Sequence, residues 1–310
     1  MPHSPAILGF DIGGTKCAVV LGRVVESAPP KILARQVFDT ARFDGAQSIL
    51  RCLCDLALEM LERQQIPISD VLAVGVSCGG PLNSKQGIVQ SPPNLPGWDD
   101  IPVIAIIEKR LGIPAKLQND ANAGALVEWH WGAARGAQTA VFLTFGTGLG
   151  AGLIINGRLH AGQNDLAGEL GHWRLAADGP VGFGKAGSFE GFCSGGGLRQ
   201  LAEQRQASTT DIKALAEAAR TGDVVAQEIF VTSGQKLGEG LALVVDLLNP
   251  EVIVLGSIFV RCEDLIRPAM EAALRREALG VAADHCRIVP AQLDEQIGDY
   301  AALAVAMNVA

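Results

Sequence analysis

Apolar residues in the first forty positions form short runs that small or polar residues separate. This pattern predicts a meander of three β-strands over residues 7–14, 16–24 and 31–39. In residues 43–65 the apolar positions recur every three or four residues, which predicts an amphipathic helix. Further elements of the first half are a strand over 71–77, a sharp turn at 78–81, an ordered loop at 91–98, a helix over 101–111, a strand over 115–118 and a helix over 121–131.

The second half opens in the same way, with an apolar strand over 139–145, a glycine-rich turn and a second strand that ends at a tight Asn156-Gly157 turn. A glycine-rich loop is expected over 176–188. The elements after it are helices over 190–205, 210–220, 223–248, 263–278 and 294–309, with strands over 251–255 and 287–292 among them. Both halves therefore run strand, turn, strand and then mixed helices and strands, which predicts two similar α/β domains.

The two glycine-rich turns are the most informative repeat in the chain. They are Phe10-Asp11-Ile12-Gly13-Gly14-Thr15-Lys16 and Phe145-Gly146-Thr147-Gly148-Leu149-Gly150. An offset of 135 residues aligns Phe10 with Phe145, Gly13 with Gly148 and Gly22 with Gly157. Small residues let backbone N–H groups approach an anion closely, and threonine hydroxyls add donors. One such turn in each half predicts a phosphate chain held in a cleft between two related domains.

The composition narrows the class of protein. At 310 residues with 48% apolar residues, the chain is long enough for two domains with separate cores. A net charge of −8 argues against binding to nucleic acid or to an anionic membrane, because both need clustered Lys and Arg. The seven cysteines are irregularly spaced, and we find neither an export signal nor a membrane-length apolar run, so a cytoplasmic protein with free thiols is expected.

A series of short motifs runs along nearly the whole chain. They are Asp11-Ile12-Gly13-Gly14-Thr15-Lys16, Gly75-Val76-Ser77-Cys78-Gly79-Gly80-Pro81-Leu82, Asn94-Leu95-Pro96-Gly97-Trp98, Asn119-Asp120-Ala121-Asn122-Ala123, the second glycine turn, Glu169-Leu170-Gly171-His172 and Val254-Leu255-Gly256-Ser257. In this order they resemble the motifs of the ROK family (repressors, open reading frames and sugar kinases). That family lies in the superfamily of sugar kinases, actin and Hsp70 ATPases.

The resemblance implies a fold and a set of site residues. The fold is two actin-like ATPase domains, of ribonuclease H-like α/β structure, with a cleft between them. The smaller domain would cover 1–118 plus 293–310, and the larger one 119–292. Contacts with the nucleotide are implied for Asp11, Gly13, Gly14, Thr15, Lys16, Thr147, Gly148 and Gly256. Contacts with the sugar are implied for Gly80, Asn94, Asn119, Glu169, His172 and Glu190.

Two aspartates are the candidates for the chemistry. Asp120 lies where a strand ends and a helix begins, so it fits either a general base that faces the substrate or a helix cap. The resemblance favours the base. Asp11 is expected to hold Mg²⁺, through water, because Mg²⁺ keeps several waters and takes one or two carboxylates. The alternative role of Asp11 is an Asx turn before the glycines. Lys16, at the end of the same motif, fits either a phosphate contact or a solvated surface charge.

One segment departs from the family pattern. Many family members follow the Glu-x-Gly-His motif with three cysteines that hold a zinc ion together with the preceding His. Here the aligned positions carry Val181, Phe183 and Ser188, while the Glu that follows is present as Glu190. A structural zinc needs four ligands and His172 alone remains, so no structural zinc is expected. Packing by Phe183 and Phe189 would then have to order this loop.

These features predict an ATP- and Mg²⁺-dependent, glucokinase-like hexose kinase that phosphorylates the 6-hydroxyl of glucose or a close relative. The same chemistry on N-acetylmannosamine, N-acetylglucosamine, fructose or allose stays open, because the sequence does not give the shape of the pocket. Polyphosphate stays open as the donor. A homodimer is expected from the resemblance, with the helices after residue 190 as its surface, and we expect the cleft to close on the sugar.

Two alternatives come from another class. Repressors of the family carry an N-terminal helix-turn-helix, whereas ten residues precede Asp11 in this sequence, so an enzyme is expected. A non-catalytic sugar-sensing regulator is the other alternative. The combination of Asp11, Asp120, Glu169 and His172 argues against it.

Overall fold

The computed structural model describes residues 4–293 and 297–308, and its contacts divide the chain into two compact units. Unit 1 comprises Met1–Trp131, Ala161–Ala167 and Glu295–Ala310; unit 2 comprises Gly132–His160 and Gly168–Asp294. The predicted domains break at 118/119 and 292/293 and so place 119–131 and 161–167 differently. Residues 161–167 join unit 1 because buried Asp165 accepts hydrogen bonds from the backbone N–H (2.8 Å) and hydroxyl (2.6 Å) of Ser84.

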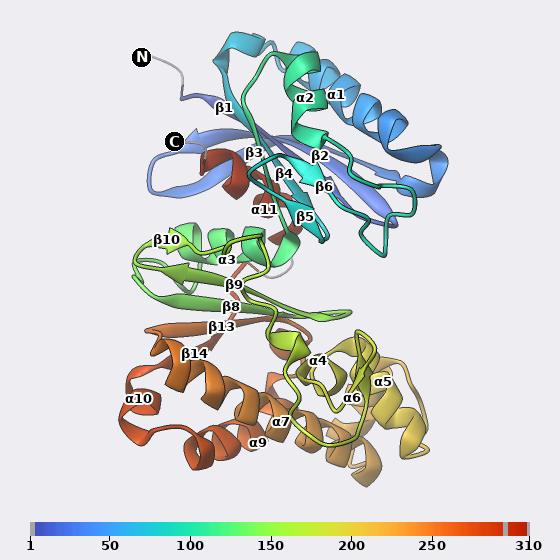
Figure 1. Cartoon of the computed structure of the whole chain (residues 1–310), viewed down its shortest axis with the longest axis vertical. Helices are drawn as coiled ribbons and strands as arrows, with labels where there is room; N and C mark the ends of the chain where they lie inside the picture. Colours follow the sequence, from blue (N-terminus) through green and yellow to red (C-terminus); the bar gives the residue numbers. More distant parts are fainter. Residues whose placement is uncertain (1–3, 294–296, 309–310) are drawn as a thin grey trace. The chain divides into compact units, whose positions relative to one another are not determined.

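The sheet of unit 1 has five strands in the order β3-β2-β1-β4-β7 (Figure 1). β1 (Ala6–Ile12), β2 (Lys16–Val25) and β3 (Ala28–Asp39) form the predicted antiparallel meander. β4 (Val71–Cys78) pairs in parallel with β1, and β7 (Ala115–Gln118) pairs in parallel with β4. A small hairpin of β5 (Leu82–Asn83) and β6 (Ile88–Val89), which was not predicted, follows β4.

Alternation along β1 supplies two cores to unit 1. Leu8, Phe10 and Ile12 point to the face covered by α1 (Gly45–Arg63) and α2 (Val103–Leu111). Ile7 points to the other face and packs with α11 (Ile297–Met307), beside which lies α3 (Asp120–Trp131). Short 3-10 turns connect the remaining segments at Thr40–Arg42 and Ile68–Asp70. The final helix was predicted over 294–309, of which 294–296 and 309 lie outside the described residues.

A glycine on β4 brings α11 directly onto the sheet. A Cβ added at Gly75 would lie 1.9 Å from the carbonyl oxygen of Ala302 and 2.3 Å from the backbone nitrogen of Ala306. Any side chain would therefore push the helix away from the strand. The last helix in the chain is fitted against one of its first strands, and this contact completes unit 1.

Unit 2 repeats the strand order, as β10-β9-β8-β13-β14 (Figure 1). Its strands are β8 (Ala140–Phe145), β9 (Leu149–Ile155), β10 (Arg158–Leu159), β13 (Val252–Ser257) and β14 (Arg287–Pro290). β8, β9 and β10 are antiparallel, and β13 and β14 extend the sheet in parallel. The prediction of a duplicated α/β plan is confirmed at the level of strand order and direction.

The helices of unit 2 follow the predicted pattern with several differences. They are α4 (Phe189–Phe192), α5 (Gly195–Gln204), α6 (Ile212–Arg220), α7 (Val224–Leu248), α8 (Ile258–Arg261), α9 (Glu263–Glu277) and α10 (Gly280–His285), with a 3-10 turn at Leu170–His172. The predicted helix 190–205 is two helices, because Ser194 caps a new N-terminus. The predicted loop 176–188 contains a hairpin of β11 (Val181–Gly182) and β12 (Lys185–Ala186). α8 and α10 were not predicted.

The offset of 135 residues does not align equivalent positions. Phe10 pairs with Val19 inside its ladder, whereas Phe145 closes its ladder opposite Leu149. Gly22 lies inside β2, while Gly157 has φ +66° in the turn between β9 and β10. The two hairpins are alike in topology, and their glycines have different structural roles. No helix within the described residues is long and apolar enough to cross a membrane.

Candidate active site

The first glycine turn joins β1 to β2 and is closed by backbone hydrogen bonds. The Gly13 N–H donates to the Lys16 carbonyl at 3.1 Å. Thr40 holds the turn from outside, because its hydroxyl donates to the Gly13 carbonyl (2.7 Å) and its N–H to the Thr15 carbonyl (2.9 Å). Thr15 and Lys16 themselves are exposed. The side chains predicted to contact phosphate thus stand at the surface of a fixed turn.

Asn94 lies against two turns of unit 1, the first glycine turn and the sharp turn at 78–81. A Cβ at Gly14 would lie 2.2 Å from the Asn94 carbonyl oxygen, and one at Gly79 would lie 3.3 Å from the atoms of its side-chain amide. The loop that carries Asn94 is anchored by Trp98, which is 1% exposed and therefore cannot stack on a sugar. The structure brings predicted nucleotide and sugar residues together here, with exposed Gly80 next to Gly79.

The hydrogen bonds at the start of α3 distinguish Asn119 from Asp120. Asn119 is the cap of α3, because its Oδ1 accepts the Asn122 N–H at 2.7 Å. Asp120 begins the helix, and its Oδ1 accepts the adjacent Ala121 N–H at 2.9 Å. Its side chain keeps an exposed surface, yet the protein around it removes enough water to raise its pKa, against the opposing effect of the Ala121 N–H. A carboxylate with a raised pKa is a suitable general base.

Asp11 is half-buried at the end of β1, between Ala18 and Ser77 of the neighbouring strands. Its pKa is raised to about 7, chiefly by loss of water and in addition by the negative charges of Asp120 and Asp299, while Arg35 opposes the rise. This surplus of negative charge around one carboxylate fits a divalent cation that keeps most of its waters. Asp11 would hold the Mg²⁺ there.

The second glycine turn, in unit 2, rests on the start of α5. The Gly146 N–H donates to the Gly148 carbonyl at 3.0 Å, which closes the turn. The Gly195 N–H donates to the Gly146 carbonyl at 2.8 Å, and Ser194 caps the same helix by accepting the Gly197 N–H at 2.9 Å. The turn and a helix N-terminus therefore lie side by side, which is an environment that favours anions.

A cavity of about 540 Å³ opens beside this turn. Its lining includes apolar Ile212, Ala216 and Ile258 together with the cationic side chains of Arg199 and Lys213. Gly256, which was predicted to contact the nucleotide, is buried at the end of β13 and does not line the cavity; its neighbour Ser257 does. The contribution of α5 and α6 was not predicted from the sequence, although the run Ser194-Gly195-Gly196-Gly197 at a helix start was a signal for it.

Glu190 connects the turn to the Glu-x-Gly-His segment. Its Oε2 accepts the Leu149 N–H at 3.0 Å, and a Cβ at Gly148 would lie 2.7 Å from that oxygen. A Cβ at Gly171 would lie 3.3 Å from the Cβ of Glu190. Glu169 is exposed and His172 is half-buried in the same segment. The residues of unit 2 that were predicted to contact the sugar thus lie near the second glycine turn.

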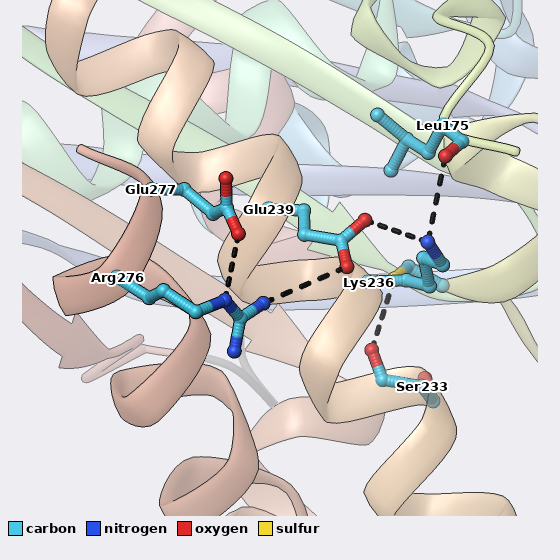
Figure 2. A network of polar contacts seen from close by, with 7 residues as sticks. Leu175, Ser233, Lys236, Glu239, Arg276 and Glu277 are labelled. Atoms are coloured by element: carbon cyan, nitrogen blue, oxygen red, sulfur yellow. Dashed lines mark hydrogen bonds and ion pairs between the residues drawn. The ribbon is translucent and has the colours of Figure 1, made fainter.

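Side chains of α7 anchor the loop that follows His172. Lys236 donates to the Leu175 carbonyl (3.4 Å) and pairs with Glu239 (2.7 Å), as Figure 2 shows. Ser233 donates its hydroxyl to the Phe192 carbonyl at 2.8 Å, at the end of α4. Both ends of the segment 173–192 are therefore tied to one long helix.

The segment does not fit a zinc ion. Val181 and Phe183 carry no ligand atom, and the Ser188 hydroxyl is buried, where it accepts the Gly191 N–H at 3.0 Å as the cap of α4. Cys193 is also buried, and its thiol donates to the Ser233 carbonyl. Among residues 4–293 and 297–308, no group of three or more His, Cys, Asp or Glu side chains could hold a metal.

Comparison with known proteins identifies the family. The profile of the ROK family matches residues 7–308, so the chain belongs to the ROK family. A glucokinase of Thermotoga maritima is 30% identical over 275 residues, which is 84% of each chain. The crystal structure of a ROK hexokinase from Thermus thermophilus matches with a TM-score of 0.83 and 29% identity, over 98% of each chain. That of a ROK glucokinase from Streptomyces griseus, with glucose and AMPPNP, matches with a TM-score of 0.76 and 31% identity, over 98% of this chain and 99% of that one. The fold class is accordingly actin-like α/β.

Proposed function

We propose that the chain is an ATP-dependent hexose kinase that transfers a phosphoryl group to the 6-hydroxyl of glucose or a closely related hexose. Family membership and the glucokinase relatives support a hexose kinase that uses ATP. The choice of hydroxyl, of hexose and of general base is the proposal's own. Phosphoryl transfer needs alignment, charge neutralisation and one base, and the two units supply residues for each.

The observation that carries the proposal is the pair Asn119 and Asp120. Because Asn119 caps α3, Asp120 can face the acceptor hydroxyl and take its proton. The hydroxyl oxygen then bonds to the γ-phosphorus of ATP, the bond from that phosphorus to the bridging oxygen breaks, and ADP leaves. Mg²⁺, held by Asp11, supplies charge neutralisation for the phosphates when it is bound. Asn94, on the loop beside Gly14 and Gly79, is placed to bind sugar hydroxyls within the same unit.

Unit 2 would bind the nucleotide, and it carries further residues for the sugar. Adenosine suits the cavity beside the second turn, since apolar walls accept the base and the cationic side chains at α5 and α6 attract phosphate. Thr147 and Gly148 would contact the phosphates. Glu169, His172 and the second oxygen of Glu190 would bind sugar hydroxyls, and a site built for specific hydroxyls rejects sugars that lack them.

The test is a coupled ADP-release assay on purified protein with glucose, N-acetylmannosamine, N-acetylglucosamine, fructose and allose, with ATP or polyphosphate as donor. We expect ATP- and Mg²⁺-dependent turnover with glucose or one close relative. Tight sugar binding by calorimetry without turnover on any sugar would instead indicate a sugar-sensing regulator. A cytoplasmic location and a homodimer also belong to this proposal, and sizing by light scattering tests the dimer.

A further inference from the structure

The hairpin β11–β12 carries an exposed aromatic residue in an unfavourable backbone conformation. Its turn is Phe183-Gly184, with φ +47° and +74°. Such turns favour Asn or Gly at the first position, and a bulky residue in this region costs on the order of 1 kcal/mol or more. Phe183 is also 70% exposed. Its ring contacts that of His172, which lies 4.8 Å away at an interplanar angle of 67°, an edge-to-face contact.

A second residue of the hairpin reaches the main chain of the same histidine. Lys185 Nζ donates to the His172 carbonyl oxygen at 2.6 Å, and Lys185 is half-buried. A hydrogen bond from a charged donor is shorter and stronger than a neutral one. Lys185 therefore fixes the backbone of His172, while Phe183 limits the rotation of its ring.

The base of the hairpin is held firmly enough to serve as a support. The Gln200 side chain of α5 accepts the Val181 N–H and donates to the Val181 carbonyl, both at 2.8 Å. On the other strand, Arg174 donates to the Ala186 carbonyl at 2.7 Å. Neither of these contacts requires a metal.

We propose that residues 181–186 form a metal-free clamp that positions the His172 imidazole for the sugar. Lys185 and Phe183 are positioning residues, and they act where many family members use zinc. The inference rests on the proposed function for the claim that His172 binds the sugar. The clamp itself rests on the contacts above, and it predicts that zinc is needed neither for activity nor for the order of this segment.

The main test is Lys185→Met, which keeps the length of the side chain and removes the donor. We expect the KM for the hexose to rise about tenfold, the cost of one charged hydrogen bond, with the KM for ATP within about twofold of wild type. Lys185→Arg should restore most of the loss. Lys109→Met, at an exposed position of α2, is the matched control and should leave both constants unchanged.

Phe183→Ala tests the ring contact. We expect a rise of about threefold to tenfold in the hexose KM, because an aromatic pair contributes less than a charged hydrogen bond. Leu247→Ala is the control, since Leu247 is also 70% exposed and lies on α7. Hexose KM values within twofold of wild type in both Lys185→Met and Phe183→Ala would overturn the clamp.

Two further readouts separate the clamp from the function. Hydrogen exchange over 170–189 should accelerate in Lys185→Met and not in Lys109→Met, whether or not the protein is a kinase; unchanged exchange overturns the clamp. Metal analysis should find no stoichiometric zinc, and a zinc chelator with Mg²⁺ in excess should leave turnover intact. Stoichiometric zinc whose removal abolishes turnover would contradict the proposal. Absence of any hexose turnover in the wild type, with exchange responding as expected, would overturn the proposed function alone.

Discussion

The two glycine turns occupy the same place in two sheets of the same strand order, but different groups pack against them. The first follows a half-buried carboxylate, Asp11, and packs against the main chain of Asn94. The second packs against the start of α5 and borders a cavity with cationic side chains. The Glu190 carboxylate accepts the Leu149 N–H of this turn. The two turns therefore share a topology and differ in the charge around them, which is negative at Asp11 and positive at the cavity in unit 2.

The largest expected effect is confined to unit 1. Asp120→Asn removes the base and keeps the size of the side chain, so we expect kcat to fall by about 10² to 10⁴ with little change in sugar affinity. Steady-state kinetics and calorimetry with the hexose measure the two quantities. Glu62→Gln, exposed on α1, controls for loss of a carboxylate. A variant that retains most of its kcat would remove Asp120 from the mechanism.

Alanine in each turn compares the turns directly. At Gly14 the added Cβ meets the Asn94 carbonyl oxygen at 2.2 Å, and a backbone atom cannot move aside cheaply. At Gly148 it meets the end of the Glu190 side chain at 2.7 Å, which can rotate. We expect Gly14→Ala to lower kcat/KM for the hexose by about 10- to 100-fold and Gly148→Ala to raise the KM for ATP by less than tenfold.

The reverse order of severity would show that the Asn94 loop is soft and that Glu190 is rigid. Circular dichroism of both variants checks that the fold survives. If both variants are folded, the kinetic constants alone compare the two turns.

Asp11 predicts a stability difference that depends on pH. Its pKa is about 7 in the folded protein and 3.8 ordinarily, so the folded state binds a proton that the unfolded state releases between about pH 4 and 7. Stability should therefore fall as the pH rises through that window. The Asp11→Asn variant has no carboxylate to ionise at this position, so it does not lose this stability as the pH rises. Without Mg²⁺ at pH 8, we expect it to stabilise the protein by on the order of 1–2 kcal/mol, or a few degrees in Tm, while it impairs turnover.

Thermal unfolding at pH 5 and pH 8 measures the effect, and the gain should be larger at pH 8. Asp70→Asn, an exposed carboxylate in the 3-10 turn before β4, controls for the loss of one charge. A gain of equal size at both pH values would show that ionisation of Asp11 is not its cause.

The smallest effect is expected at the rim of the cavity in unit 2. Arg199→Ala removes an exposed cation, and exposed charges contribute little in water. We expect the KM for ATP to rise by about twofold to fivefold, more strongly at low salt, with the KM for the hexose unchanged. A change in the hexose KM alone would contradict the assignment of this cavity to the nucleotide.

The sequence predicted the elements that alternation and turns define, and it missed those that packing decides. The β1–β2 and β8–β9 hairpins follow from apolar runs around glycines, and their predictions are confirmed. The hairpin 181–186 was predicted as loop because two-residue strands leave no measurable period. The cavity beside α5 and α6 joins residues far apart in sequence, so Arg199 and Lys213 carried no local signal.

The site was predictable where a residue and its motif coincide. Asp120 was predicted as base or cap and Asn119 as a sugar contact, and the hydrogen bond from Asn122 shows that Asn119 caps the helix. The order of the motifs predicted the ROK family, which the comparisons confirm. The catalytic role of Asp120, the magnesium at Asp11, the sugar contacts and the cleft between the domains stay predictions.

The close fit of α11 on Gly75 has a consequence for biosynthesis. Residues 297–307 leave the ribosome after every strand of this sheet, so Ile7, Val20 and Ala73 lack the cover of α11 while those strands are being made. One apolar face of the first sheet stays without this helix until α11 has been synthesised. A nascent chain stalled before residue 297 should therefore recruit chaperones that a released one does not.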